Sequence, residues 1–238
     1  MSLLAVERLD AFYGASQILR SIDLAIAPGE AVAVAGRNGM GKTTLLRSLM
    51  GLVPDRRGRI AFRGRDIGAA PPEAIAQAGI AFVPEGRGVF GSLDVVENLV
   101  MAARPGADGR RTWTLQRIFE LFPRLYERRR NGGHQLSGGE QQMLTIGRAL
   151  MTNPDLILID EATEGLAPLV ARDIWRTIEV IRQEGVAAIV VDKDMRSLSR
   201  VVDRVLVIAK GEFVFTGSPA ELAAKPDVLE RHLGLQAA

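Results

Sequence analysis

A glycine-rich loop that ends in lysine and threonine carries the clearest chemistry in this sequence. Residues Gly36–Thr43 read Gly-Arg-Asn-Gly-Met-Gly-Lys-Thr, which fits the spacing G-x-x-x-x-G-K-T in full. Glycines let the backbone curl until successive N–H groups face phosphate oxygens, Lys42 adds a point charge, and the Thr43 hydroxyl reaches Mg²⁺. The loop therefore predicts a site for a nucleoside triphosphate. The residues expected to hold it are Gly36, Arg37, Asn38, Gly39, Met40, Gly41, Lys42, Thr43 and Thr44.

An acidic pair, Asp160-Glu161, directly follows the apolar run Leu156–Ile159. The run predicts a buried strand, and ligands of open α/β sheets bind at the carboxyl ends of such strands. One carboxylate can hold Mg²⁺ there, and the next can orient and polarise an attacking water. The alternative is an Asp-Glu pair that only caps a helix.

A second phosphate-binding candidate is Ser137-Gly138-Gly139, which precedes a helix predicted over residues 140–151. Small residues at a helix start expose N–H groups and a hydroxyl to an anion. A helix cap followed by glycines would look the same. The residues alone leave the two interpretations open.

The elements that must position these residues alternate between strands and helices. The small-apolar run 31–35 predicts a buried strand that leads into the loop, and a helix follows over 42–50. A polar-apolar alternation over 58–66 predicts an edge hairpin. The remaining predictions are helices at 95–103, 114–121, 140–151 and 171–183, and strands at 156–159, 187–191 and 205–208. Such alternation predicts an α/β fold with a mainly parallel sheet covered by helices.

Composition narrows the class of protein. The chain has 238 residues, which suits one α/β domain with appended subdomains, and its net charge of +2 does not favour nucleic acid as a partner. Cysteine is absent, which excludes disulfides and thiolate metal sites. The first residues show no signal-peptide pattern, and the apolar runs have strand length. We therefore expect a soluble, cytoplasmic protein whose membrane role, if any, depends on a partner.

The phosphate loop, the segment Leu136–Gln141 and the Asp160-Glu161 strand end occur in an order and spacing that resemble the ATP-binding subunit of an ABC transporter. The resemblance covers essentially the full length. It implies one ABC ATPase domain over 1–238, with a P-loop NTPase core, an N-terminal antiparallel β subdomain and an inserted helical subdomain over about 86–150. In this family two subunits pack head to tail, so that each ATP lies between one loop and the other chain's signature. The signature residues implied to contact the partner's ATP are Ser137, Gly138, Gly139 and Glu140.

The resemblance also assigns roles around the loop. Tyr13 matches the aromatic residue that stacks on adenine, although an ordinary half-buried tyrosine is the alternative. Glu85 stands where the general family has glutamine, and a carboxylate there can still ligate Mg²⁺ together with Thr43 and Asp160. Glu161 would orient the water. ATP and Mg²⁺ are thus the implied cofactors.

The sequence of residues 82–90, Phe-Val-Pro-Glu-Gly-Arg-Gly-Val-Phe, resembles more specifically one of the two ATPases of branched-chain amino acid uptake systems. Related subunits serve urea and short amides. The implied partners are a second ATPase subunit, as homodimer or heterodimer, membrane permeases and, indirectly, a periplasmic substrate-binding protein. The chain would lie on the cytoplasmic side of the membrane. A non-transport ABC ATPase and a degenerate, binding-only partner are the rival hypotheses.

Lys193 and Ala162 also depart from the family pattern. Lys193 stands where a histidine usually contacts the γ-phosphate, so it either makes that contact or pairs with Asp192 and Asp194. Ala162 stands where proline usually follows the catalytic glutamate. Without the ring, φ is freer and the placement of Glu161 could loosen.

Overall fold

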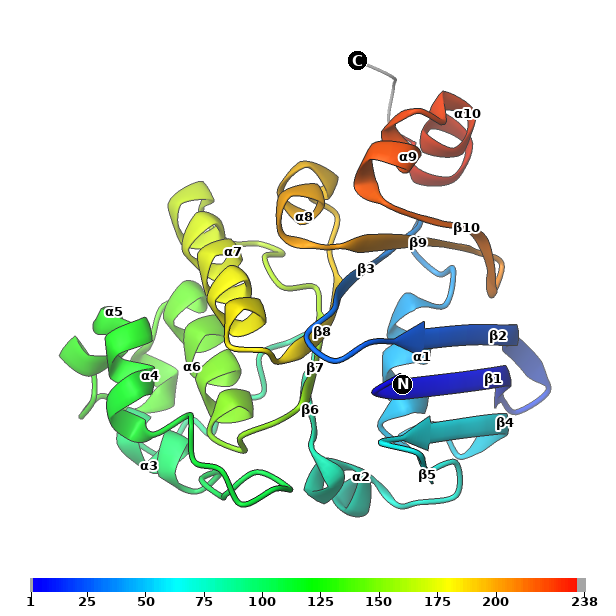
Figure 1. Ribbon diagram of the computed structural model, residues 1–238. Helices are drawn as coiled ribbons and strands as arrows, with labels where there is room; N and C mark the ends of the chain where they lie inside the picture. The colour runs from blue at the N-terminus through cyan, green and yellow to red at the C-terminus, as the bar shows by residue number, and fades with distance from the viewer. Residues whose placement is uncertain (1, 235–238) are drawn as a thin grey trace.

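A six-stranded sheet forms the centre of the protein in the computed structural model, which describes residues 2–234 (Figure 1). Its strand order is β10-β9-β3-β8-β7-β6, and all neighbouring pairs are parallel except β9 with β10. The mainly parallel sheet predicted from the sequence is therefore confirmed. The strands are β3 (Ala31–Ala35), β6 (Ile80–Val83), β7 (Leu156–Asp160), β8 (Ala187–Val191), β9 (Arg204–Ala209) and β10 (Glu212–Gly217).

A second sheet, antiparallel throughout, has the order β2-β1-β4-β5 and lies to one side of the central sheet (Figure 1). This confirms the expected N-terminal antiparallel subdomain, and β4 with β5 forms the predicted hairpin. The turn between them, Arg63-Gly64, has positive φ at both residues, as a type I′ hairpin turn requires. The strands are β1 (Leu4–Tyr13), β2 (Ser16–Ile26), β4 (Asp55–Phe62) and β5 (Arg65–Asp66).

The central strands are buried on both faces, and their alternate residues belong to two different hydrophobic clusters. Along β3, Ala31, Ala33 and Ala35 join the cluster that contains α6 and α7 side chains. Val32 and Val34 join the cluster that contains α1 and the antiparallel sheet. A parallel strand covered on both faces must be apolar at every position, which explains its continuous apolar sequence. The helices named here are α1 (Lys42–Leu49), α6 (Gly138–Leu150) and α7 (Pro168–Gln183).

Helices fill the side of the molecule that lies away from the antiparallel sheet (Figure 1). Their starts are capped by Asp94, Thr114 and Ser137, each of which accepts a hydrogen bond from the N–H three residues later. The predicted helices at 95–103 and 114–121 are present but shorter, and that at 140–151 begins two residues earlier than expected. The elements are α3 (Val95–Val100), α4 (Leu115–Leu121), α5 (Pro123–Glu127) and η1 (Gly133–Gln135).

Several short elements carried no sequence signal that we used. They are α2 (Pro72–Ala78), α8 (Met195–Val201), α9 (Pro219–Ala223), α10 (Pro226–Val228) and η2 (Leu229–Leu233), together with β6. Strand β6 has only four residues, a length at which an apolar run is ambiguous between strand and helix. Over residues 2–234, no helix combines the length and the apolar character that crossing a bilayer would need.

Candidate functional site

The glycine-rich loop leaves the carboxyl end of β3 and enters α1, in the strand–loop–helix order that the motif predicts. Its glycines Gly36, Gly39 and Gly41 have φ of 152°, 76° and 108°. A Cβ at Gly36 would overlap the Ile208 carbonyl oxygen, and one at Gly41 would come within 2.9 Å of Leu19 Cδ2. Gly39 instead faces open space. The loop is thus packed against the protein on one side and free to receive a phosphate group on the other.

Lys42 lies at the start of α1, with its ammonium group inside the loop. The Nζ atom donates to the carbonyl oxygens of Gly36 (2.8 Å) and Arg37 (3.0 Å). Burial lowers the pKa of Lys42, the Asp160 carboxylate opposes that shift, and nearby Lys193 adds to it. The positive charge is therefore held at the mouth of the loop, where phosphate oxygens would lie.

A cavity of about 430 Å³ opens beside the loop, a volume within the range of small-molecule sites. Tyr13, at the end of β1 and 43% exposed, forms one wall. Glu85 and Glu161 form another. The complete lining is Tyr13, Ile18, Asn38, Gly39, Gly41, Lys42, Thr43, Thr44, Glu85 and Glu161. Chain segments far apart in the sequence thus converge here, and Ile18 is the one lining residue that sequence reasoning missed.

Three predicted loop residues, Gly36, Arg37 and Met40, are absent from that lining. Met40 anchors the loop, because its carbonyl accepts from the Gly211 N–H (3.2 Å) and its sulfur from the Lys210 N–H (3.3 Å). Arg37 contributes its carbonyl to Lys42. These residues shape the loop from behind.

Asp160, the last residue of β7, is a buried carboxylate. It is 1% exposed, and neither oxygen has a partner of normal geometry among residues 2–234. Burial raises its pKa and Glu85 adds to the effect, whereas the nearby Thr43 hydroxyl and Lys42 oppose it. An uncompensated carboxylate next to a hydroxyl and a second carboxylate fits a hard divalent cation such as Mg²⁺, which prefers oxygen ligands.

Glu161 sits in a strained backbone conformation that the neighbouring strand enforces. Its φ is +51°, which is unfavourable for a residue with a Cβ and typical of functional sites. The following residues are tied to β8: the Ala162 N–H donates to the Val191 carbonyl (3.4 Å), and the Thr163 N–H donates to Asp192 (2.7 Å). A proline at position 162 would lack that N–H. The alanine therefore adds an anchor, which counters the loosening that we expected.

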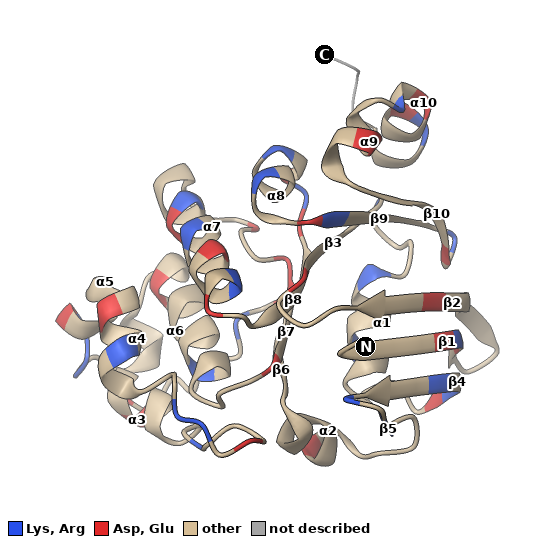
Figure 2. Ribbon diagram, viewed as in Figure 1, with Lys and Arg blue, Asp and Glu red and all other residues tan. Residues whose placement is uncertain are grey.

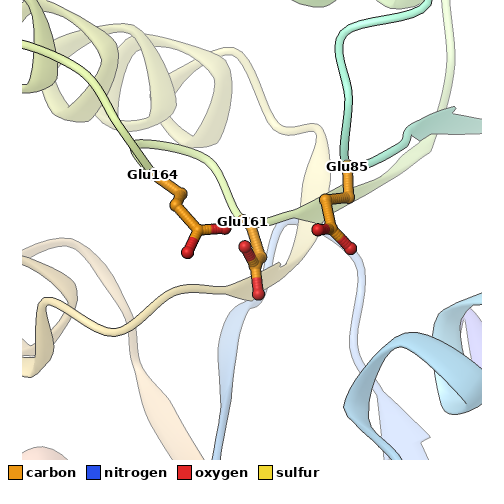
Figure 3. A group of neighbouring side chains, drawn as sticks. All are labelled: Glu85, Glu161 and Glu164. Atoms are coloured by element: carbon orange, nitrogen blue, oxygen red, sulfur yellow. The ribbon is translucent and has the colours of Figure 1, made fainter. Parts of the chain in front are cut away.

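Glu161 belongs to a group of three carboxylates with Glu85 and Glu164 (Figure 3). One carboxylate oxygen of each lies within 4.8 Å of the others, with Glu161 between its two neighbours in the figure. Glu164 was not among the residues predicted for the site. The sequence signal that could have identified Glu164 is its position three residues after Glu161.

Lys193 pairs with Glu164 rather than with Asp192 and Asp194, the pairing that the sequence left open as the alternative to a contact with the γ-phosphate. Asp192 instead accepts from the Thr163 N–H, the Thr163 hydroxyl (2.8 Å) and the Asp194 N–H (2.9 Å). Asp194 caps α8 by accepting from the Ser197 N–H (3.1 Å). Both carboxylates are thus already engaged with backbone donors. The hydrogen bond from Lys193 to Glu164 raises the pKa of the lysine.

A second cavity, of about 410 Å³, shares Glu85 and Glu161 with the first and extends away from the loop. Sequence reasoning gave no role to most of its lining. It is lined by Glu85, Gly86, Arg87, Gln141, Gln142, Glu161 and Glu164.

The predicted signature residues form the first turn of α6. The Ser137 hydroxyl accepts from the Glu140 N–H (3.3 Å), and Glu140 accepts in return from the Ser137 N–H (2.8 Å), which makes a capping box. A Cβ at Gly139 would come within 2.5 Å of Val170, so that glycine allows α6 and α7 to pack closely. Ser137, Gly138, Gly139 and Glu140 do not line the loop cavity.

A third cavity, of about 710 Å³, lies at the opposite, amino ends of the strands. Asp155, on its wall, already pairs with Arg63 (2.8 Å) and Arg110 (2.5 Å), so we regard this cluster as structural. Elsewhere basic and acidic residues are interleaved along α7 (Figure 2). One such pair is Arg176 with Asp173, at 3.6 Å, which is typical of a solvated helix face.

Comparisons with known proteins agree with this geometry. The family model described as ABC transporter matches residues 19–164. The chain is 38% identical over 232 residues to the high-affinity branched-chain amino acid transport ATP-binding protein BraG of Pseudomonas aeruginosa, with 98% of this chain and 100% of BraG covered. It is 33% identical over 242 residues to the lipopolysaccharide export system ATP-binding protein LptB of Haemophilus influenzae, with 99% of each covered.

Among solved structures, a nucleotide-free ATP-binding cassette from an ABC transporter matches with a TM-score of 0.84 at 24% identity, over 97% of this chain and 98% of that chain. This likeness supports the fold. Since the family model spans more than half of the sequence and both relatives match from end to end, the chain belongs to the ABC transporter family as an ATP-binding subunit, an ATPase coupled to transport.

Proposed function

We propose that the chain is the ATP-hydrolysing subunit of an ABC importer for branched-chain amino acids. The observation that carries this proposal is the 38% identity to BraG over almost the whole chain, compared with 33% to LptB. The sequence Val-Pro-Glu-Gly-Arg at residues 83–87, which resembles that of ATPases in branched-chain amino acid uptake, also supports the proposal. We further propose one ABC ATPase domain over 1–238 with a helical subdomain over about 86–150, located at the cytoplasmic face of the membrane.

ATP would lie in the 430 Å³ cavity, with its adenine against the Tyr13 ring and its phosphates against the loop N–H groups. Lys42 would exchange the carbonyls of Gly36 and Arg37 for the β- and γ-phosphate oxygens. Thr43, Glu85 and Asp160 provide the oxygen atoms that would hold Mg²⁺, which neutralises phosphate charge when bound.

In hydrolysis, Glu161 would accept a hydrogen bond from the attacking water and orient it toward the γ-phosphate. The strained φ of +51° aims its carboxylate at the cavity. Lys193 can reach the γ-phosphate only if it leaves Glu164, so we propose it as an optional contact in the closed state.

The signature would serve a second ATP, held by the loop of a partner ATPase. Its position outside the loop cavity supports this division, because Ser137 does not line the space where the chain's own nucleotide would lie. The hydroxyl hydrogen of Ser137 remains available, since its oxygen acts as acceptor in the cap. The N–H groups at the start of α6 add the positive end of a helix dipole.

A permease would dock on the groove of about 360 Å³ that lies between β6 and α6. Phe90, 44% exposed, lies near this groove with the Arg148 guanidinium 4.6 Å above its ring. Arg148 also donates to the Gly88 carbonyl (2.6 Å). The segment from Glu85 to Phe90 therefore connects the nucleotide cavity with the proposed permease groove.

The test is transport by the assembled complex in proteoliposomes, with the permeases, the second ATPase and the periplasmic binding protein. We expect ATP-driven uptake of leucine, isoleucine and valine, and none when this chain and its partner ATPase both carry Lys42→Ala or its equivalent. Uptake of urea or acetamide instead would assign the chain to the related amide systems. Extraction of lipopolysaccharide without any of these solutes would assign it an export role, as in the system of LptB. Either result contradicts the proposal.

A degenerate, binding-only subunit is the second candidate, because Lys193 replaces the usual histidine and is engaged with Glu164. A complex in which the partner ATPase has lost its equivalent of Glu161, and this chain keeps Glu161, would decide between the two candidates. We expect measurable phosphate release that disappears on Glu161→Gln. Absence of turnover in such a complex would favour the degenerate role.

A further inference from the structure

Residues 86–89 form a turn whose conformation the turn alone cannot maintain. Gly86, Arg87 and Gly88 all have positive φ, of 87°, 68° and 56°. For Arg87, which has a Cβ, this conformation is unfavourable, and a glycine on each side gives the backbone extra freedom. Such a segment keeps one conformation only if its surroundings hold it.

Helix α6 supplies what holds the turn. In the described part of the chain, both hydrogen bonds that tie residues 86–89 to another element come from this helix. The Thr145 hydroxyl donates to the Arg87 carbonyl, and Nη1 of Arg148 donates to the Gly88 carbonyl (2.6 Å). The two donors are three residues apart in sequence, so they lie on one face of the helix. The turn is therefore docked on α6 through two successive carbonyl groups.

We propose that Thr145 is a positioning residue, whose hydroxyl docks this turn on α6 and thereby holds Glu85 in place for the cation of Mg·ATP. Thr145 is 6% exposed, so its bond to the turn is shielded from water. Glu85 directly precedes the turn and lines the cavity beside the phosphate loop. Without the hydroxyl, the glycines on either side of Arg87 would let Glu85 move away from that cavity. The part played by Glu85 rests on the proposed function, whereas the docking of the turn does not.

The Thr145 hydroxyl also has a second acceptor, the Gln141 carbonyl one turn earlier in α6, at 2.9 Å. A hydroxyl carries one proton, so it cannot donate fully to both carbonyls at once. A bond to the carbonyl four residues earlier is a recurrent choice of threonine in helices. The turn can thus be released without leaving the hydroxyl unsatisfied, but the Arg87 carbonyl then loses its donor. The hydroxyl is the group that selects between a docked and a released turn.

Thr177 in α7 offers a comparison within the same chain. It is 3% exposed, and its hydroxyl donates to the Asp173 carbonyl, again four residues earlier (2.9 Å). Within the described residues this hydroxyl has no second acceptor. A change at Thr177 therefore removes a bond within the helix alone, whereas a change at Thr145 also removes the docking bond.

The first measurement is hydrogen exchange of the full-length chain without nucleotide, read by mass spectrometry on peptides that cover residues 84–90. The Gly88 N–H, which donates to the Gly86 carbonyl (2.8 Å), reports on the turn. Thr145→Val keeps the branched shape and removes the hydroxyl, so exchange should be at least about three-fold faster, as for the loss of one hydrogen bond. Thr145→Ser retains the hydroxyl and should exchange like the wild type. Thr177→Val, the matched control, should do the same.

The second measurement is the affinity of the full-length chain for the non-hydrolysable analogue AMP-PNP, by calorimetric titration with EDTA and again with Mg²⁺. The gain in affinity that Mg²⁺ gives should be about 3- to 10-fold smaller in Thr145→Val, the size of one hydrogen bond. The affinity with EDTA should not change, because the loop Gly36–Thr43 is untouched. A purely structural role of Thr145 would lower stability without lowering this gain.

The proposal is overturned if Thr145→Val exchanges at the wild-type rate, if Thr145→Ser behaves like Thr145→Val, or if the gain from Mg²⁺ is the same in Thr145→Val as in the wild type. A wild type that gains nothing from Mg²⁺ would overturn the role of Glu85 together with the proposed cation site. Exchange would then still decide whether Thr145 docks the turn, which keeps the two failures apart. Thermal unfolding of each variant checks that the fold is retained.

Discussion

Replacing Asp160 with asparagine should stabilise the protein while removing its activity. Asp160 is 1% exposed, and neither carboxylate oxygen has a hydrogen-bond partner of normal geometry in the described chain. Lys42 does not compensate fully, because its ammonium group donates to the carbonyls of Gly36 and Arg37. In the proposed function this carboxylate is kept for a cation, at a cost to the stability of the fold.

A buried polar group left unsatisfied costs about 1–3 kcal/mol, and more if it is charged. Asparagine preserves the shape and removes the charge, so we expect Asp160→Asn to raise the free energy of unfolding by about 1–3 kcal/mol at pH 7. For a chain of this length each kcal/mol shifts Tm by roughly 2–4 °C. Tm should therefore rise by about 2–12 °C, while Mg-dependent ATP hydrolysis falls to background.

The gain in stability of Asp160→Asn over the wild type should decrease as the pH falls. Burial raises the pKa of Asp160 in the folded state above its ordinary value of 3.8, so the folded protein holds the proton more tightly than the unfolded chain. The destabilisation is fully present above the folded pKa and disappears as pH falls through it toward 3.8. The difference between variant and wild type should shrink accordingly on acidification, as measured by urea unfolding from pH 7 down to pH 4.

Asp192→Asn is the matched control. Asp192 directly follows β8 and is 7% exposed, but its carboxylate accepts hydrogen bonds from Thr163 and from the Asp194 N–H. Loss of these charge-assisted bonds should destabilise the protein by about 1–3 kcal/mol. The two asparagine variants are thus expected to differ in sign. Equal destabilisation by both would refute the view that Asp160 is buried for cation binding.

Variants at three further positions test the nucleotide cavity. Glu161→Gln should bind ATP with wild-type affinity but release phosphate at least about 100-fold more slowly, and unchanged turnover would remove Glu161 from the mechanism. Tyr13→Ala should weaken ATP binding by about 1 kcal/mol, roughly five-fold, whereas Tyr13→Trp should retain it; calorimetric titration that finds equal affinities would argue against stacking. Gly41→Ala, with φ of +108° and Leu19 Cδ2 at 2.9 Å from the added Cβ, should cost about 1–3 kcal/mol in urea unfolding and abolish ATP binding. A Gly41→Ala protein of wild-type stability would show that the loop tolerates a side chain there.

Features that depend on adjacent residues were predictable from the sequence. The all-apolar strand Ala31–Ala35, the glycine loop and the helix from Lys42 follow one another directly, so local pattern was sufficient. The buried strand before Asp160 is of the same kind. Its burial on both faces leaves the same continuous apolar signal.

Features that depend on how separate loops meet were not predictable in this way. For Lys193 the sequence left two possibilities open, a contact with the γ-phosphate or a pairing with its neighbours Asp192 and Asp194. Both of those carboxylates are bound to backbone N–H groups, and the lysine pairs with Glu164 from the preceding loop. Gln142 reads as an ordinary helical residue until α6 brings it beside Glu85. Strand β6 is too short to be recognised without the neighbour that pairs with it.

We propose that the chain carries two half-sites: its own phosphate loop, and a signature that contacts the nucleotide held by the partner. The direct measurement is the number of ATP molecules bound per pair of ATPase subunits. Only this chain is altered, the partner ATPase is wild type, and ATP hydrolysis by the complex is blocked. Lys42→Ala alone should leave one ATP, Ser137→Arg alone should leave one, and the double variant should leave none. If the double variant still binds one ATP, the wild-type partner holds its nucleotide unaided and the two half-sites are not shared between chains.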